Sequence, residues 1–512
     1  MKRIISILIV LAMICSLAAC TQSNLEDNTT AAPESSATEA ESTEVTEGTS
    51  ANNITTDNAT EGTTEAESED ESEDAPEIIL EPALINGVSI AEYTIVYDAE
   101  GLDYNKRAAE YVQSEILARC GVKLQIVDDS TSPSSHEIII GETSRELSLE
   151  LDKECEGLEF SMLTKNGNVA LEGDYFIIAA AAYYFIDTSK FLSGANITVD
   201  DGSLVSTPIV KEAKNYILLI GDGMGVNHTL LFDYLEDTSD YSDKEDLFYG
   251  YLLPYKGFSR TDSLSGTTDS AAGGTAIACG QKTYNAHIGI DKDQNDIQSL
   301  TELAISLGMA GAVMSTENKT GATPAAFSAH ALDREDSQEI SEDQTKFYLE
   351  KGAILDCGYD YYNYNNVNKI IEKHIKDTLS KASANENGFF LMYEEAYTDK
   401  HSHNNDIEKI FLAMLRFNQA IGRFMEFAFY NPDTFVLITA DHETGGILID
   451  EDGNITFTSD DHTSANVPIF AYGYGAELFN SQTIENIQIG QTIASFFGVY
   501  DFGDQSEFSY LK

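Results

Sequence analysis

Basic residues are scarce in this chain of 512 residues, which has 30 Lys and Arg against 86 Asp and Glu and a formal net charge of −56. Nucleic acids and anionic membrane faces bind clustered basic side chains, so the charge argues against either as a dedicated partner. If the substrate is an anion, its site must reverse the local field. The apolar fraction of 42% is ample for real cores, and the length fits two or three domains.

The apolar runs at 4–17 and 176–186 are too short to span a bilayer comfortably. The first follows a basic start and ends in Leu-Ala-Ala-Cys, so residues 1–20 are interpreted as an export signal. The Leu-Ala-Ala-Cys sequence resembles the bacterial lipobox, which implies cleavage before Cys20 and lipid attachment to its sulfur. We therefore expect an extracytoplasmic protein, anchored by lipid to the bacterial cell membrane. The alternative is an ordinary signal peptide in which Cys20 has no role.

Cysteine is also sparse, and no Cys-x-x-Cys spacing for zinc or redox chemistry occurs. Beyond the signal and Cys20, the scattered cysteines are Cys120, Cys155, Cys279 and Cys357. One disulfide, for example between Cys120 and Cys155, stays open at this stage.

The segment 21–77 contains no Lys, Arg or aromatic residue and consists mainly of Thr, Ser, Ala, Asn and Glu. Such a composition cannot bury enough apolar surface to offset the entropy of ordering, so we expect a disordered acidic tether.

Residues 78–205 predict a small α/β domain. Strands are expected at 93–97, 123–127, 137–140, 160–164 and 168–171, and helices at 103–119 and 175–189. Asn166-Gly167 between two of these strands is a strong hairpin signal. The region resembles the α/β accessory domain that precedes the catalytic domain of some glycoside hydrolases, and it shows no catalytic constellation.

From 213 to 512, short apolar runs alternate with helical stretches such as 406–430, which predicts an open, mainly parallel sheet with helices on both faces. Three expected strands, 216–220, 389–393 and 434–439, run respectively into Asp222, into Glu394, Asp399 and His403, and into Asp441 and His442. His462 precedes another apolar run. Open α/β sheets bind ligands at the carboxyl ends of their strands, and buried unpaired carboxylates are costly, so this grouping favours a metal site.

Known nucleotide-binding loops are absent from the first of these strand ends. Gly221–Val226 lacks the full Gly-x-Gly-x-x-Gly spacing, and no Gly-Lys-Ser/Thr follows for a P-loop. Taken alone, the Gly-Asp-Gly turn, the Asp-His pair and the pair of Asp399 with His403 each have a structural explanation. Their conjunction at strand ends of one domain favours the metal site over these explanations.

Two further stretches suggest a nucleophile and an anion clamp. Ser270 stands at the start of a predicted helix, whose N–H groups and dipole favour an alkoxide and a bound phosphate; a plain N-cap is the alternative. Pro324 suits a first helical position with Thr323 as the cap, and Arg334 is expected about three turns along the same helix. Its guanidinium matches two phosphate oxygens, and a surface salt bridge is the alternative.

These motifs together resemble the alkaline phosphatase family. They are Gly221-Asp-Gly-Met-Gly225, Thr268-Asp-Ser-Ala-Ala272, Lys282-Thr-Tyr-Asn285, Ala322-Thr-Pro-Ala-Ala326 and Thr439-Ala-Asp-His-Glu-Thr-Gly-Gly446. The likeness covers about 213–512 and implies hydrolysis of small phosphate monoesters through a phosphoserine at a site with two Zn²⁺ and one Mg²⁺.

The resemblance also implies a role for each site residue. Asp399, His403 and His462 bind the first zinc. Asp222, Asp441 and His442 bind the second, which also receives the Ser270 oxygen. Asp222 bridges to the magnesium site, which Thr323 and Glu394 complete. Arg334 clamps the phosphate, and Asp269 positions Arg334. The three ions and Arg334 outweigh the ligand carboxylates, so an acidic protein can hold a phosphate dianion here.

The chain departs from the family pattern at several places. Gly321 stands where the best-known relatives carry a charged or imidazole residue, so metal preference at the magnesium site is open. Gly273 and Gly274 weaken the nucleophile helix by roughly 1 kcal/mol each relative to Ala. The segments 334–394 and 442–462 are short for the family, which leaves its usual homodimer in question.

Two rival functions remain at this stage. The first is another enzyme of the same superfamily, a phosphodiesterase or a sulfatase; Ser270 lacks the Cys/Ser-x-Pro-x-Arg setting of a sulfatase. The second is a surface lipoprotein with an inactive phosphatase fold and a glycan-binding N-terminal domain. A complete ligand set argues against the second.

Overall fold

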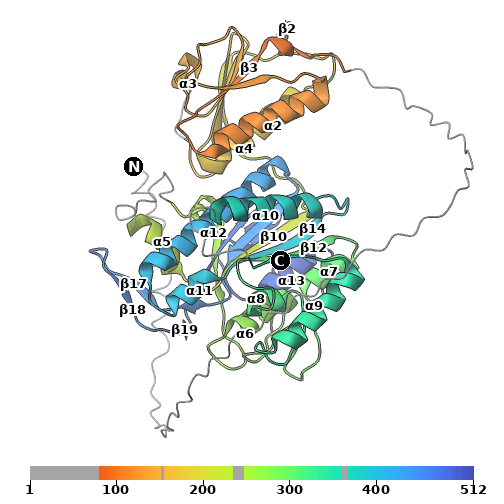
Figure 1. The fold of residues 1–512 in the computed structure, drawn as a ribbon, viewed down its shortest axis with the longest axis vertical. Coiled ribbons are helices and arrows are strands. Elements are labelled where there is room, and N and C mark those ends of the chain that lie inside the picture. Colours follow the sequence, from red (N-terminus) through yellow and green to blue (C-terminus); the bar gives the residue numbers. More distant parts are fainter. Residues whose placement is uncertain (1–79, 152–154, 235–246, 359–366) are drawn as a thin grey trace, which may run out of the picture. The chain divides into compact units, whose positions relative to one another are not determined.

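The computed structural model describes residues 80–151, 155–234, 247–358 and 367–512 (Figure 1). The predicted signal peptide and tether lie outside these residues. Everything described lies in one compact unit, Pro76–Lys512. Among the described residues no helix has both the length and the hydropathy needed to cross a membrane. The cysteines at 120, 155, 279 and 357 are free thiols. The disulfide between Cys120 and Cys155, which the sequence left undecided, therefore does not form.

The first sheet has six strands in the order β4-β3-β5-β7-β6-β9. Its strands are β3 (Thr94–Tyr97), β4 (Gln125–Asp128), β5 (Glu137–Ile140), β6 (Phe160–Lys165), β7 (Asn168–Glu172) and β9 (Gly202–Ser206). Strands β3, β4, β5 and β7 pair in parallel, and β6 is antiparallel to both of its neighbours. Asn166 and Gly167 both have positive φ, as the predicted tight hairpin between β6 and β7 requires.

The remaining elements of this region flank the six-stranded sheet or precede it. They are β1 (Leu84–Ile85), β2 (Val88–Ser89), β8 (Asn196–Ile197), the 3₁₀ turns η1 (Ile90–Glu92) and η2 (Tyr175–Ile177), and the helices α2 (Asp103–Cys120), α3 (Glu146–Glu150) and α4 (Ile178–Ser189). The strands and helices match the predicted small α/β domain closely. Its resemblance to a glycoside-hydrolase accessory domain, and the domain boundaries themselves, remain predictions.

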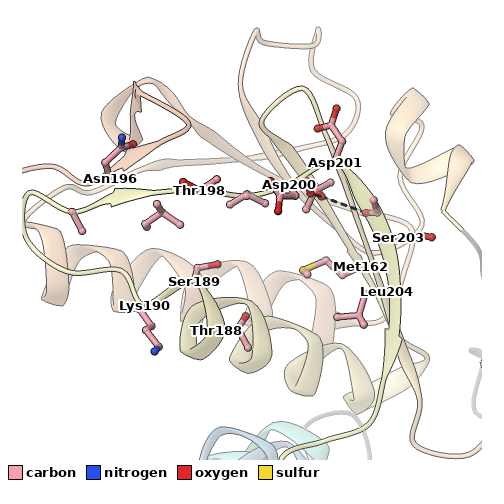
Figure 2. A pocket seen from close by; sticks show the side chains of 15 residues that line it. Met162, Thr188, Ser189, Lys190, Asn196, Thr198, Asp200, Asp201, Ser203 and Leu204 are labelled. Carbon is pink, nitrogen blue, oxygen red and sulfur yellow. Dashed lines mark hydrogen bonds between the residues drawn. The ribbon is translucent and has the colours of Figure 1, made fainter.

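A pocket of about 600 Å³ opens between α4 and the segment that joins β8 to β9 (Figure 2). Its labelled walls include Met162, Lys190, Asn196 and Asp200. None of the residues that line it is a histidine, a cysteine or an aromatic residue. The pocket therefore offers none of the predicted metal-ligating residues and no aromatic ring on which a bound molecule could stack.

The second sheet has eight strands in the order β13-β12-β14-β10-β15-β20-β11-β21. They are β10 (Asn215–Gly221), β11 (Tyr255–Arg260), β12 (Ala310–Ser315), β13 (Ile354–Cys357), β14 (Phe389–Glu395), β15 (Thr434–Thr439), β20 (Val467–Tyr472) and β21 (Thr483–Glu485). The run from β13 to β15 is parallel, and only β20 runs antiparallel to both of its neighbours. The predicted mainly parallel sheet is confirmed.

Helices cover both faces of the eight-stranded sheet (Figure 1). Because successive side chains of a strand point to opposite faces, Ile217 and Leu219 of β10 join one core cluster while Leu218 and Ile220 join another. The first cluster includes α10 (Val367–Ala382) and α12 (Ile407–Tyr430), and the second includes α7 (Leu300–Ser306) and α13 (Ile487–Phe496). A Leu-to-Ala change in such a core costs about 2–5 kcal/mol. The packing of these two clusters therefore holds the strand ends firmly in place.

Smaller elements complete this region. They are α5 (Val226–Tyr234), α6 (Ser270–Cys279), α8 (Ala322–Ala326), α9 (Ser337–Lys351), α11 (Tyr397–Ser402), η3 (Tyr249–Leu252), η4 (Ala476–Phe479), and the short strands β16 (Glu443–Thr444), β17 (Ile447–Ile449), β18 (Ile455–Phe457) and β19 (His462–Thr463). Helix α12 begins after its N-cap Asp406, close to the predicted start of the helix 406–430.

The prediction of one long helix from Thr323 to Arg334 is wrong. Helix α8 begins after Gly321, so Pro324 is its third residue rather than its first, and Thr323 is not the cap. The helix ends at Ala326, and the chain then forms an isolated bridge between Ala331 and Ile288. His330 also turns away, because its backbone N–H and its ring both bond Asp343. These long-range contacts end the helix before it can reach Arg334.

Candidate functional site

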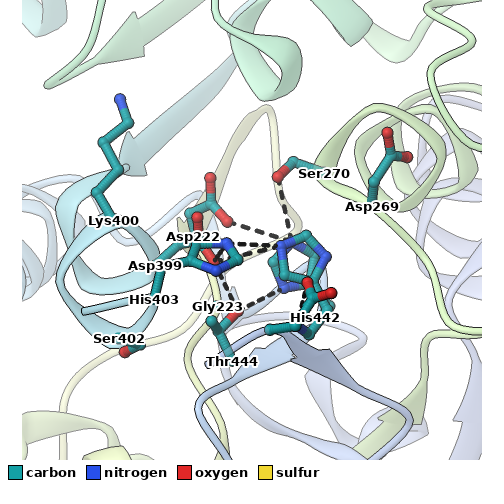
Figure 3. A network of polar contacts seen from close by, with 12 residues as sticks. Asp222, Gly223, Asp269, Ser270, Asp399, Lys400, Ser402, His403, His442 and Thr444 are labelled. Atoms are coloured by element: carbon teal, nitrogen blue, oxygen red, sulfur yellow. Dashed lines mark hydrogen bonds and ion pairs between the residues drawn. The ribbon is translucent and has the colours of Figure 1, made fainter. Parts of the chain in front are cut away.

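The first predicted ligand set lies together after β14. Asp399 lies in α11 and His403, four residues on, is the C-cap of that helix, with the Asp399 Oδ1 atom 3.4 Å from the His403 Nε2 atom. His462, from β19, brings its Nε2 atom to 3.1 Å from that of His403 and to 3.5 Å from Asp399 Oδ1. The three offer ligand atoms that all lie within 4.8 Å of one another, as one bound ion requires. Figure 3 shows Asp399 and His403 beside the rest of the site.

Backbone contacts fix which ring nitrogen each of these histidines presents. The Nδ1 atom of His403 lies 2.7 Å from the carbonyl oxygen of Asp460, and that of His462 lies 2.8 Å from the carbonyl oxygen of Thr268. A carbonyl can only accept, so both Nδ1 atoms carry the proton and both Nε2 atoms present lone pairs. Two lone pairs that face each other repel unless a cation lies between them. The arrangement therefore fits a metal ion.

The second predicted set gathers around His442. Its Nε2 atom lies 3.4 Å from Asp222 Oδ1, 3.4 Å from Asp441 Oδ2 and 3.1 Å from Ser270 Oγ (Figure 3). Asp222, Asp399 and His442 form a second group within 4.8 Å, so Asp399 faces both sets. Asp441 contacts this group by way of His442, whose Nε2 atom lies 3.4 Å from Asp441 Oδ2. The geometry thus brings the predicted nucleophile to the ligands of one ion.

Thr444 joins the two sets, and no role was predicted for it. Its hydroxyl donates to Asp399 Oδ1 at 2.6 Å and lies 3.2 Å from His442 Nδ1 (Figure 3). Since the hydroxyl proton goes to Asp399, its oxygen accepts from His442 Nδ1–H, and His442 Nε2 is left as a lone-pair donor. Gly223 allows this approach, because a Cβ there would lie 2.8 Å from Thr444 Oγ1, and its φ is +70°.

The residues of the third predicted set have unmet hydrogen bonds in common. Among the described residues, the buried atoms without a hydrogen-bond partner include Asp222 Oδ1, Thr323 Oγ1, Glu394 Oε1 and Asp441 Oδ2. The free Thr323 hydroxyl follows from the corrected helix start, since Gly321 and not Thr323 caps α8. A buried unpaired carboxylate is costly, and several together call for cations. Oxygen atoms alone are the ligands that Mg²⁺ prefers.

The electrostatics of the buried acids agree with this. Burial, followed by the charges of Asp441 and Asp399, raises the pKa of Asp222 well above its usual value. Burial, with Glu317 next, does the same to the pKa of Glu394. Burial and the charge of Asp399 raise the pKa of Asp441 to about 7. These carboxylates repel one another, and bound cations remove that penalty.

Ser270 is the first residue of α6, as predicted, but the N-cap of that helix is Asp269. Asp269 Oδ1 accepts the N–H of Ala272 at 2.9 Å, and Oδ2 accepts the N–H of Ala286 at 2.8 Å. Oδ2 also lies 3.4 Å from Arg334 NH1. Asp269 is thus fixed by two backbone donors and orients Arg334, although Arg334 comes from a loop rather than from α8.

Close packing explains one of the glycines in the nucleophile helix. A Cβ at Gly273 would lie 2.9 Å from the carbonyl oxygen of Asp441. The helix can therefore approach the strand end that carries Asp441 and His442 only without a side chain there. Glycine lowers the helix propensity of α6, but it lets the helix that carries the nucleophile come closer to this strand end.

His228 lies beneath the site and belongs to none of the predicted motifs. The backbone N–H of Gly225 donates to its Nδ1 atom at 3.1 Å, so its Nε2–H donates to Ser402 Oγ at 3.0 Å. Burial lowers its pKa to about 3, so the ring stays neutral. The ring ties the loop of Asp222 to α11. Its signal in the sequence is weak, since buried histidines are common.

Comparisons with known proteins point to one family. The family model for alkaline phosphatase matches residues 213–350 and 363–453. Alkaline phosphatase 3 of Bacillus subtilis (strain 168) is 30% identical over 293 residues, which are 47% of this chain and 63% of that protein. Alkaline phosphatase 4 of the same organism is 27% identical over 322 residues, which are 52% of this chain and 69% of that protein.

A solved structure, the alkaline phosphatase from the Antarctic bacterium TAB5, is 26% identical with a TM-score of 0.49 and covers 56% of this chain and 99% of that one. The first of the curated relatives is matched over less than two thirds of its own length. The residues that the family model matches contain every predicted ligand except His462, together with the predicted nucleophile and clamp. Residues 213–350 and 363–453 are therefore similar to alkaline phosphatases, which are metal-dependent phosphatases.

Proposed function

We propose that the protein hydrolyses phosphate monoesters to an alcohol and inorganic phosphate, with a phosphoserine intermediate on Ser270. The observation that carries this proposal is the position of Ser270 Oγ, 3.1 Å from His442 Nε2 and at the start of α6, opposite buried carboxylates with unmet hydrogen bonds. A serine hydroxyl needs activation to become a nucleophile. Here the groups that can provide it converge on one atom.

The ligand sets above fit two Zn²⁺ at the imidazole-containing groups and one Mg²⁺ at the oxygen-only group. When bound, such ions activate the nucleophile and the water and stabilise the charge that develops on the oxygens around phosphorus. The histidines at 403, 442 and 462 would hold ions through Nε2, since each Nδ1–H is engaged elsewhere.

The chain's own residues account for substrate binding and group transfer. Arg334 binds two nonbridging phosphate oxygens, and the dipole of α6 favours the same dianion. Ser270 Oγ forms the new bond to phosphorus, and the bond to the alcohol oxygen breaks on the opposite side, where the alcohol takes up a proton. A water then attacks the phosphoserine and breaks its bond to Ser270 Oγ; one proton of the water goes to Ser270 and its OH group leaves with the phosphate.

The test is phosphate release from an aryl monoester and from the matching diester by the full chain. We expect the monoester to be the better substrate, chelator to abolish turnover, and Ser270→Ala to reduce it by at least about a thousandfold. A faster diester reaction favours the phosphodiesterase alternative. Full activity of Ser270→Ala overturns the proposed intermediate. No phosphate release with full metal content favours an inactive surface protein.

We further propose that the protein acts outside the cytoplasm, anchored by lipid on Cys20. The support is the Leu-Ala-Ala-Cys sequence after the apolar run. Labelled fatty acid should be incorporated into the wild type and not into Cys20→Ser. The homodimer of the family stays a prediction, and sedimentation of the soluble chain tests it.

A further inference from the structure

Glu317 lies beside the third predicted set of ligands, although no motif contains it. It follows the end of β12 by two residues, and its backbone N–H donates to Ser315 Oγ at 3.0 Å. The Ser315 hydroxyl in turn donates to Glu394. The Glu317 side chain is only 15% exposed, and its charge acts on both Glu394 and Asp222. Glu317 therefore adds a negative charge at the edge of an acidic cluster.

The space for this carboxylate exists because position 321 is glycine. A Cβ at Gly321 would lie 1.8 Å from Glu317 Oε1 and 2.1 Å from its carboxyl carbon. The φ of Gly321 is −58°, which any residue adopts, so the backbone does not require glycine here. What excludes a side chain is the Glu317 carboxylate itself. Gly321 is the N-cap of α8, and Thr323 is the second residue of that helix, so the Glu317 carboxylate lies beside the turn that leads to Thr323.

A lysine partly neutralises the added charge. Lys400 forms an ion pair with Glu317 and follows Asp399 in α11. Its side chain is 41% exposed and lies over the ring of Tyr397. The cluster thus contains one acidic group whose counter-charge is a partly exposed lysine. A divalent ion nearby competes with that lysine.

We propose that Glu317 is a further acidic group of the magnesium site, bonding the water shell of the ion, and that Lys400 competes with the ion for it. Glu317 lies outside the predicted ligand set, so we place it at the water shell of the ion rather than in direct coordination. Mg²⁺ keeps several of its waters in proteins, and a carboxylate beyond its direct ligands would accept hydrogen bonds from those waters. The inference rests on the third ion of the proposed function.

Calorimetric titration of Mg²⁺ into the zinc-loaded full chain tests it without reference to turnover. For Glu317→Gln we expect the Kd for Mg²⁺ to rise about 10–100-fold, as for other outer partners of metal ligands. For Lys400→Met we expect the Kd to fall, since the competing charge is gone. Glu150→Gln, which breaks an exposed ion pair with Lys165, is the matched control and should leave the Kd unchanged.

A rescue variant separates the charge from the fold. Glu317→Ala together with Gly321→Asp places a carboxylate in the same space from the other residue, and Asp is also a good N-cap for α8. We expect it to bind Mg²⁺ more tightly than Glu317→Ala alone. An unchanged Kd for Mg²⁺ in Glu317→Gln, or a higher Kd in Lys400→Met, overturns the inference and leaves the proposed function standing. A wild type that binds no Mg²⁺ overturns both the inference and the third ion.

Discussion

The two sheets of this protein carry acidic residues after their strands, but the surroundings of those acids differ. Beside the six-stranded sheet, Asp98 accepts two backbone N–H groups within three residues, and Asp128 accepts the N–H two residues on. Beside the eight-stranded sheet, Asp222, Glu394 and Asp441 each leave a buried oxygen unpaired within the described part of the chain. An acid after a strand is therefore not in itself a metal ligand.

The pKa values follow the same division. Hydrogen bonds from the Ser130 side chain and backbone lower the pKa of Asp128. At Asp222, hydrogen bonds of this kind do not offset burial, and burial raises the pKa well above its usual value. An acid held by local donors closes a turn, whereas a buried acid without them calls for a cation.

The largest effect expected from this comparison is at Asp222. Asp222→Asn should weaken binding of divalent ions by at least about 100-fold, beyond what loss of an outer partner costs. In metal-free protein the same change should raise the Tm, because it removes one of several like charges that repel each other. Metal titrations and calorimetric melting with and without chelator measure both. Asp128→Asn is the control, and a similar loss of ions there would erase the distinction between the two sheets.

Beside the six-stranded sheet a buried ion pair should matter for stability alone. Glu137 and Arg145 lie 3.0 Å apart, and both are nearly fully buried. Arg145→Met leaves Glu137 without its partner and should destabilise the fold by about 3 kcal/mol. Denaturant unfolding gives the loss, and phosphate release per folded molecule should not change. Lower activity in the folded fraction would connect this region to the reaction.

Thr444 tests how rigidly the two zinc sets are coupled. Thr444→Val keeps the shape but removes the hydroxyl that bonds Asp399 and His442, so affinity for Zn²⁺ should fall about 10–100-fold. Thr444→Ser keeps the hydroxyl and should retain most of the affinity. Competition with a zinc indicator measures both. Equal affinities of the two variants would show that the hydroxyl does not orient the ligands.

A smaller effect concerns pH and a histidine away from the ligand groups. Hydrogen bonds and charges of Asp343 and Glu302 outweigh the lowering by burial and raise the pKa of His330 to about 10. A raised folded pKa stabilises fully below the unfolded value near 6.5, and this stabilisation is lost as the pH rises toward 10. His330→Gln should therefore flatten the dependence of the unfolding free energy on pH over that range. A parallel pH profile in the variant would contradict this.

The sequence predicted the fold well wherever local pattern decides it. The strand 434–439 was readable as a short continuous apolar run, and the helix 406–430 because its apolar residues recur on one stripe. The grouping of acids and histidines after three parallel strands followed from topology, since such strands end at one edge.

Long-range packing decided the rest. Arg334 is not helical, because the chain after Ala326 pairs with Ile288 instead. Glu317 and Thr444 show their contacts only when separate strand ends meet, and Gly321 could be interpreted only once the Glu317 carboxylate was seen beside it. None of these contacts has a period or a spacing that a single sequence reveals.

The most direct test of the account is the metal content of the folded full chain after exposure to Zn²⁺ and Mg²⁺. The account predicts three divalent ions per chain, two of them zinc, and a lower count in Asp441→Asn. A folded wild type that releases phosphate at full rate while holding fewer than one ion per chain would contradict it.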